Sequence, residues 1–127
     1  MDTNVWKGST KNASVVASAE ATNVVTITIQ LQDVSLNALT KRNTVLAYLS
    51  DDAAGDSIAA TAPDGNIVIA TDGLLIPIVA NKAFFLTSEA DGDIDLTLTE
   101  SGTATWYLVV VLPKGDLVIS NAITLAA

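Results

Sequence analysis

A strict alternation of apolar and polar residues, DIDLTLT, runs from Asp93 to Thr99. Ile94, Leu96 and Leu98 fall on one face of an extended chain, and the aspartates and threonines between them fall on the other. An Asp-Gly turn signal precedes this run and a Ser-Gly signal follows it. Alternation with a period of two, bounded by turn residues, is typical of a half-buried antiparallel strand. The segment therefore predicts an all-β fold.

The rest of the chain from Val24 repeats this pattern of short strands between turns. The predicted strands are Val24–Gln32, Thr44–Ser50, Ile58–Thr61, Asn66–Thr71, Leu74–Ala80, Phe84–Ser88, Asp93–Thr99, Thr105–Leu112 and Leu117–Leu125. About eight or nine short strands, with turn signals roughly every 8–12 residues, suit an antiparallel β-sandwich or a small barrel. Pro77 cannot donate a hydrogen bond, so the strand that contains it is expected at a sheet edge or a bulge.

The first 23 residues differ in composition from the rest, being rich in Ser, Thr, Asn and Ala. They contain Trp6, a large apolar residue to leave in a frayed terminus. Besides a frayed terminus, two interpretations stay open: an extended arm that docks on a neighbouring molecule, or a first strand around Ser14 to Ser18. We expect residues 1–23 to form this arm or strand, and residues 24–127 to form the sandwich domain.

Two predicted strands have more apolar residues than a sandwich strand needs. Thr105–Leu112 has Trp106 on one face and Tyr107 on the other, each among aliphatic neighbours, and Thr44–Ser50 carries Tyr48 in a similar setting. Because exposed apolar patches on soluble monomers are usually small, the second face needs a cover. The cover is either a loop or the N-terminal arm of the same chain, or another subunit. We expect self-association.

The chain contains neither His nor Cys among its 127 residues. Nucleophilic pairs that use His, cysteine-ligated zinc, most transition-metal sites and the usual general base near neutral pH are therefore missing. Its length suits one domain with a real core. We expect no enzyme and no cofactor.

The formal net charge is −8, from fourteen carboxylates and six basic residues. A polyanion would be repelled by such a surface, so we expect no nucleic-acid partner. No apolar run reaches the roughly 18 residues that span a bilayer, so no membrane partner is expected. The first residues lack the apolar region of a secretory signal, which predicts synthesis and use in the cytosol unless a leader was removed.

The best metal candidates are the alternating carboxylates Asp91, Asp93 and Asp95, whose oxygens suit calcium. The EF-hand order of ligands is absent, and on a strand Asp93 and Asp95 would face solvent. The acidic loop Asp51–Asp56 is a similar but weaker candidate. We expect surface carboxylates at both places and predict no metal site.

Tyr107 follows the turn at Ser101 and Gly102 near the start of a strand. This position matches the corner tyrosine of Ig-like sandwiches, whose hydroxyl bonds back to a loop. Trp106 is the alternative for the core position. Either residue would have a structural role there.

Several segments carry a likeness to a known class of proteins. They are LAYLSDDAAG from Leu46 to Gly55, the long segment from Ala70 to Ser120, and the ending NAITLAA. From about Val24 onward, about four-fifths of the chain resembles small Ig-like proteins encoded among the virion structural genes of tailed bacteriophages. The order of turns and strands also resembles the bacterial Ig-like domains of adhesins.

The resemblance implies a non-enzymatic virion component, and we expect a capsid decoration or cement protein. Such a protein is made in the host cytoplasm, sits on the outer capsid surface, and binds and stabilises the assembled shell of major capsid protein. A homo-oligomer is expected, with a trimer favoured. The contact residues expected are Trp6, Val15, Val16, Tyr48 and Tyr107. The alternative is a tail or baseplate accessory, or an Ig-like adhesion module that binds a host-surface carbohydrate or protein.

Overall fold

Two neighbouring strands decide which side chains enter the core. β2 (Val24–Gln32) pairs antiparallel with β7 (Asp93–Thr99), and the register places Ile27 opposite Leu96. Because side chains alternate between the faces of a strand, this register directs all the aliphatic residues of both strands to one side. They are fully buried, while the threonines, glutamines and aspartates between them face outward. The predicted orientation of the alternating strand is confirmed.

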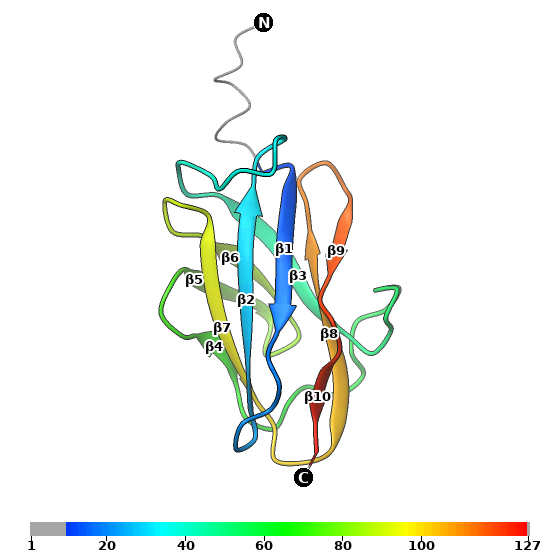
Figure 1. Cartoon of the computed structure of the whole chain (residues 1–127). Coiled ribbons are helices and arrows are strands. Elements are labelled where there is room, and N and C mark those ends of the chain that lie inside the picture. Colours follow the sequence, from blue (N-terminus) through cyan, green and yellow to red (C-terminus); the bar gives the residue numbers. More distant parts are fainter. Residues whose placement is uncertain (1–9, 127) are drawn as a thin grey trace, which may run out of the picture.

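The structure is a computed structural model that describes residues 10–126, in which ten strands form two antiparallel sheets and no helix occurs (Figure 1). The other strands are β1 (Asn12–Ala17), β3 (Thr44–Ser50), β4 (Ile67–Ile69), β5 (Leu74–Val79), β6 (Ala83–Thr87), β8 (Ala104–Val111), β9 (Leu117–Ile119) and β10 (Ile123–Leu125). Within the described range there is accordingly no helix of the length and apolarity that would cross a membrane.

The strand order is that of an Ig-like sandwich with one extension. One sheet has the order β1-β2-β7-β4, and the other has the order β10-β8-β3-β6-β5, with β9 also paired to β8. The arrangement β1-β2-β7-β4 against β9-β8-β3 corresponds to strands A-B-E-D and G-F-C of immunoglobulin domains. The β5-β6 hairpin widens the second sheet. The predicted all-β, Ig-like antiparallel β-sandwich is therefore confirmed.

The core lies between the two sheets and contains side chains from both. Its largest fully buried members are aliphatic apart from one aromatic, Phe84 on β6. They are Ile27, Ile29, Leu31, Leu49, Phe84, Leu86, Ile94, Leu96, Leu98, Leu108, Ile123 and Leu125. Trp106 on β8 is buried beside them, so the core position belongs to Trp106 and not to Tyr107.

Two predicted strands differ from the structure. Ile58–Thr61 is not a strand, because hydrogen bonds tie this segment to the end of β3: the Ala59 amide donates to the carbonyl of Leu49 at 2.7 Å, and the Ala60 amide to the Asp51 carboxylate at 2.9 Å. The predicted final strand is divided into β9 and β10. Both pair with β8, and the pairing register shifts by one residue between them.

A first strand occupies part of the N-terminal segment, as one of the two interpretations has it. β1 pairs with β2 along six residues, with Val15 opposite Ile29. The side chains of Val15 and Ala17 are buried in the core. Residues 1–9, and with them Trp6, lie outside the described part of the chain.

β5 is the last strand of its sheet, and it pairs only with β6 within that sheet. Its register shifts between Pro77 and Val79. The prediction from Pro77, an edge position or a bulge, is confirmed, and the strand has both features. Almost every residue of this edge strand is exposed, although all six are apolar.

Candidate protein interface

The two sheets present outer faces of opposite character. The six strands of the larger sheet contain no charged residue. The outward positions of β2 and β7 in the smaller sheet are Thr, Gln and Asp, after Val24 at the start of β2. The charged residues of this chain, whose net charge is −8, therefore lie outside the strands of the larger sheet.

The register of the larger sheet aligns its outward apolar residues in rows across five strands. One row runs Leu117–Val111–Leu46–Phe85–Ile76 and the next runs Ile119–Val109–Tyr48–Ala83–Val79. We call these ten residues, together with Leu74 and Tyr107, the apolar face. Residues opposite one another on neighbouring strands have side chains in contact range, so the rows form one continuous surface.

Much of the apolar face is open to solvent. Ile76 is 51% exposed and Phe85 43%, and Leu74, Val79 and Leu117 are exposed to a similar degree. With Ile78 at the bulge, these half-exposed side chains present on the order of 500 Å² of apolar surface, near the upper end of the largest patch on a typical monomer. The largest apolar patch on a monomer is often functional.

A loop of the same chain covers the remaining part of the apolar face. The Tyr48 hydroxyl donates a hydrogen bond to the Gly55 carbonyl at 2.5 Å, and Val109 beneath this loop is fully buried. Gly55 has a φ of +73°, and a Cβ there would lie 3.1 Å from a methyl of Val109, so glycine lets the loop approach closely. Burial, and to a lesser extent the nearby carboxylate of Asp56, raises the pKa of Tyr48.

The edge of this loop and the sheet enclose a shallow groove of about 260 Å³. Leu46, Tyr48 and Ala83 line it from the sheet, and Ile58 lines it from the loop. Asp56 is the charged residue in its lining. Because Ala83 and Phe85 are two residues apart on β6, the groove continues into the exposed part of the apolar face.

The structure brings together two of the five predicted contact residues. Tyr48 and Tyr107 both lie on the apolar face, on the neighbouring strands β3 and β8. Val16 is 54% exposed, but on the outer face of the smaller sheet. Val15 is buried in the core and offers no surface for a partner, because its register with Ile29 turns it inward. Trp6 lies outside the described residues.

The tyrosine that bonds back to a loop is not the predicted one. Tyr107 faces outward on β8, and the hydroxyl that holds a loop carbonyl belongs to Tyr48. The loop that follows β3 folds back over the sheet, which brings Gly55 to Tyr48 although the two are seven residues apart. Such a return of the chain depends on tertiary packing and has no local sequence signal.

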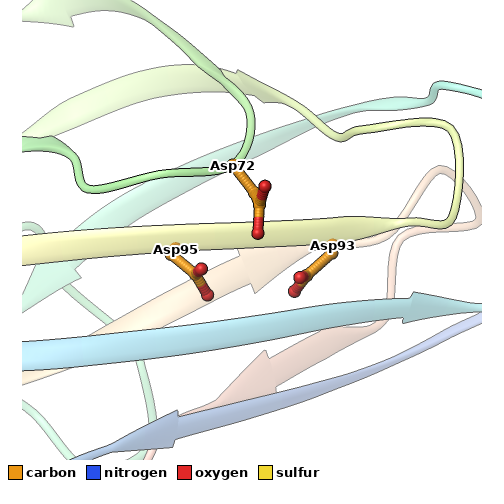
Figure 2. Close-up of side chains that lie close together, drawn as sticks. All are labelled: Asp72, Asp93 and Asp95. Atoms are coloured by element: carbon orange, nitrogen blue, oxygen red, sulfur yellow. The ribbon is translucent and has the colours of Figure 1, made fainter.

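Three carboxylates gather on the smaller sheet, which is the closest structural counterpart of the predicted calcium candidate. Oxygens of Asp72, Asp93 and Asp95 lie within 4.8 Å of one another (Figure 2). Asp72 comes from the turn after β4, and its carbonyl accepts a hydrogen bond from the Asp95 amide at 3.0 Å. The predicted third member, Asp91, instead accepts a hydrogen bond from the Asp93 amide. Oxygen ligands of this kind suit a hard cation, but exposed carboxylates often cluster without one.

The crowding of these carboxylates changes the protonation of one of them. Partial burial, a hydrogen bond with the Asp72 carboxyl and the charges of the neighbouring carboxylates together raise the pKa of Asp93 to about 6. The Asp93 carboxyl can therefore keep its proton, directed at Asp72, in mildly acidic solution. The group lies on an open sheet surface and not in the groove, so it lacks the enclosure of an acid–base pair in an active site.

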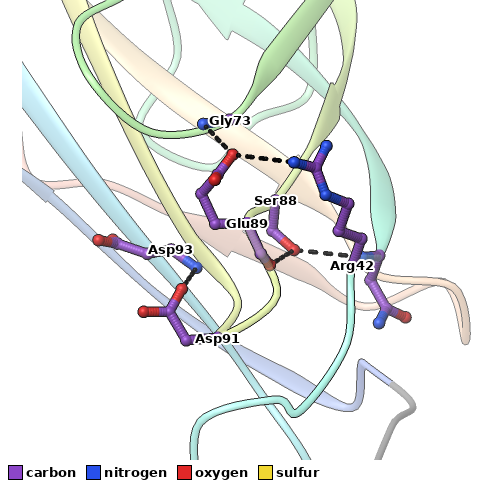
Figure 3. A network of polar contacts seen from close by, with 7 residues as sticks. Arg42, Gly73, Ser88, Glu89, Asp91 and Asp93 are labelled. Carbon is purple, nitrogen blue, oxygen red and sulfur yellow. Dashed lines mark hydrogen bonds and ion pairs between the residues drawn. The ribbon is translucent and has the colours of Figure 1, made fainter.

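A polar network ties together the loops beside these carboxylates (Figure 3). The Glu89 carboxylate accepts a hydrogen bond from the Gly73 amide at 3.1 Å and lies 3.6 Å from the Arg42 guanidinium. Ser88 bonds to Asn43 through both its amide and its hydroxyl. Because both ends of the Arg42–Glu89 pair are well exposed, its contribution is to position the turns more than to stabilise the fold.

The sequence prediction missed the most exposed members of the apolar face, namely Leu74, Ile76, Val79, Phe85 and Leu117. A signal was present in the adjacent pair Phe84 and Phe85, because consecutive residues of a strand point to opposite faces and both cannot enter the core. The neutral composition of all six strands was a second signal. Neither signal identifies the face by itself, because the sequence does not show to which sheet each strand belongs.

No protein-family model matches the chain, and no curated protein matches it. The likeness to phage virion proteins therefore rests only on the segments quoted from the sequence.

Proposed function

We propose that this chain is a non-enzymatic structural protein that acts by binding other proteins, as a decoration or cement protein on the outer capsid surface of a tailed bacteriophage. The observation that supports protein binding is the apolar face, a neutral surface on a strongly acidic molecule. The virion setting is supported by the sequence resemblance alone.

Several properties favour binding over catalysis. The chain has no His and no Cys to act as base or nucleophile. The pKa of Asp93 is shifted, but its carboxylate cluster lies on the outer face of the smaller sheet. Catalytic groups normally converge in a concave site, and the groove lies on the other sheet.

As a cement protein the chain would act by mass action. A subunit that bridges several major capsid proteins binds the assembled shell and not free capsid protein, so its binding free energy adds to the stability of the shell. Copies joined into a homo-oligomer, for which a trimer is favoured, would bind with avidity and need only weak contacts each. The protein would be made in the host cytoplasm and added to the shell after assembly.

The alternative, an adhesion module or a tail accessory that binds a host-surface carbohydrate or protein, has less support. Sugar-binding surfaces use exposed aromatic rings as stacking platforms. Among the large hydrophobic residues exposed between residues 10 and 126, only Phe85 is aromatic. The rest of the open surface is aliphatic, which suits a protein partner better.

Co-sedimentation with expanded capsid shells that lack this protein, taken from the phage that encodes it, tests the proposal. The wild-type chain should pellet with the shells and delay their thermal disruption. Phe85→Thr should weaken both effects, and Val68→Thr, which changes an exposed apolar residue on the other sheet, should change neither. Wild-type protein that stays in the supernatant and leaves shell stability unchanged would refute the cement role.

A further inference from the structure

We propose that a second copy of this chain covers the apolar face. This inference rests on the proposed protein-binding function and names the partner of that surface. The partner has to bury Phe85, Ile76 and their half-exposed neighbours, and it has to tolerate a surface without charge.

Area is the first argument. A stable interface buries about 800 Å² on each partner. The exposed residues of the apolar face supply on the order of 500 Å² of apolar surface, and the polar rim of an interface adds to that. Two copies packed through the same face would therefore approach a standard interface. A two-fold arrangement needs only one self-complementary patch, which the face provides.

Charge is the second argument. Two molecules of charge −8 repel each other unless their carboxylates stay apart. Asp93 and Asp95 lie on the opposite sheet, and packed sheets are about 10 Å apart, so a face-to-face pair separates the two sets by roughly 30 Å. The Debye length at physiological ionic strength is about 8 Å, so this repulsion is screened. Asp56 stands at the edge of the groove, where solvent reaches it.

A basic partner fits this face less well. Positive side chains gain energy where carboxylates lie, and the carboxylates of this chain are in the loops and on β7. The six neutral strands offer such a partner nothing to pair with. A second copy offers an equally neutral and aliphatic surface.

The groove gives the contact a specific centre. It lies beside Ala83, two residues along β6 from Phe85, and its walls are mainly apolar. In a two-fold pair whose axis passes between these positions, the Phe85 ring of each copy enters the groove of the other. Aromatic anchors in such pockets commonly dominate the affinity of an interface.

Light scattering behind a sizing column, with the full-length chain from micromolar to millimolar concentration, tests the inference. The wild-type mass should reach twice the 13.1 kDa of one chain, and the dissociation constant of Phe85→Thr should rise at least tenfold. Val68→Thr, on the outer face of the smaller sheet, should associate like the wild type. A monomer at every concentration, or an oligomer that Phe85→Thr and Ile76→Thr leave intact, would overturn it.

Hydrogen exchange provides a second test that needs no variant. Amides of β5 and β6 should become more protected as wild-type concentration rises, while those of β1 should not. A wild-type monomer that still binds capsid shells through Phe85 would assign the face to the capsid protein. That result would overturn this inference and leave the proposed function standing.

Discussion

The side chain of Asn121 forms two hydrogen bonds to the backbone of Ala17, across 104 residues of sequence. Its oxygen accepts from the Ala17 amide at 2.8 Å, and its amide donates to the Ala17 carbonyl at 2.9 Å. Asn121 lies between β9 and β10 of one sheet, and Ala17 ends β1 of the other. The side-chain amide of Asn121 thus pairs with Ala17 as the backbone of a neighbouring strand would. It joins the two sheets at their shared edge.

Asn121→Ala should destabilise the fold, because it leaves the amide and carbonyl of Ala17 without partners in a partly buried place. We expect a loss of about 1–3 kcal/mol in the free energy of unfolding, measured by urea denaturation. Asn121→Asp keeps the acceptor but sets a carboxylate oxygen against the Ala17 carbonyl, so it should approach wild-type stability only where its carboxyl is protonated and can donate. Ser14→Ala, an exposed change on β1, should have little effect. Equal stability of Asn121→Ala and wild type would show that the two bonds are replaced by water.

Phe84 and Phe85 are adjacent and should respond oppositely to truncation. Phe84 is fully buried, so Phe84→Ala should lower the free energy of unfolding by about 3–5 kcal/mol. Phe85 faces outward, so Phe85→Ala should lower it by less than about 1 kcal/mol for the monomer. Denaturation at low micromolar concentration measures both. The reverse ranking would mean that β6 has slipped by one residue.

Stability should fall as the pH rises through mildly acidic values. The folded-state pKa of Asp93, about 6, lies above its ordinary value of 3.8, so the folded protein binds more protons than the unfolded chain between these values. The free energy of unfolding therefore declines from about pH 4 to about pH 6, and the loss persists at pH 7.

Asp93→Asn isolates this effect, because its amide can donate to Asp72 as a protonated carboxyl does. At pH 7 it should raise the free energy of unfolding by up to about 1 kcal/mol, a value reduced for solvent screening. It should also flatten the pH profile between 4 and 6. Asp56→Asn removes one charge at a distance from the cluster and serves as the control. A steeper profile in Asp93→Asn would contradict the raised pKa of Asp93.

The loop over Val109 depends on close approach at Gly55. Gly55→Ala should destabilise by about 1–3 kcal/mol, because its φ of +73° is strained for alanine and the new methyl meets Val109. Tyr48→Phe should cost about 1 kcal/mol through the lost bond to the Gly55 carbonyl. Thermal unfolding gives the stability, and limited proteolysis within residues 51–59 reports loop opening. Resistance to protease unchanged in both variants would argue against this anchoring.

Local sequence patterns predicted those features of the fold that depend on a single strand and its turns. The alternation in Asp93–Thr99 specified the strand, its inward face and its all-β setting, and Pro77 predicted an edge position or a bulge for its strand, which has both. These predictions hold because the side-chain period and the missing proline donor act within a few residues. Val15 was expected to contact a partner, but its side chain is buried. The face on which it lies depends on the register with β2, which its own neighbours in the sequence do not specify.

The candidate site was less predictable because it is assembled from separate strands. Tyr48 and Tyr107 were expected as contacts and do lie on one face, yet Phe85 and Ile76 expose more of that face. The acidic cluster shows the same limit, since Asp72 enters it from a distant turn. Only the pairing of β7 with the chain after β4 brings that residue to Asp93.

Pro77 has a consequence for how far assembly can proceed. It interrupts the row of donors on β5, and the bulge after it bends the strand, so an additional strand cannot continue the ladder in register. Growth of the sheet strand by strand, the route to fibrils, is therefore blocked at the most exposed apolar edge. The molecule can therefore present an apolar binding surface at high local concentration and still form only small oligomers.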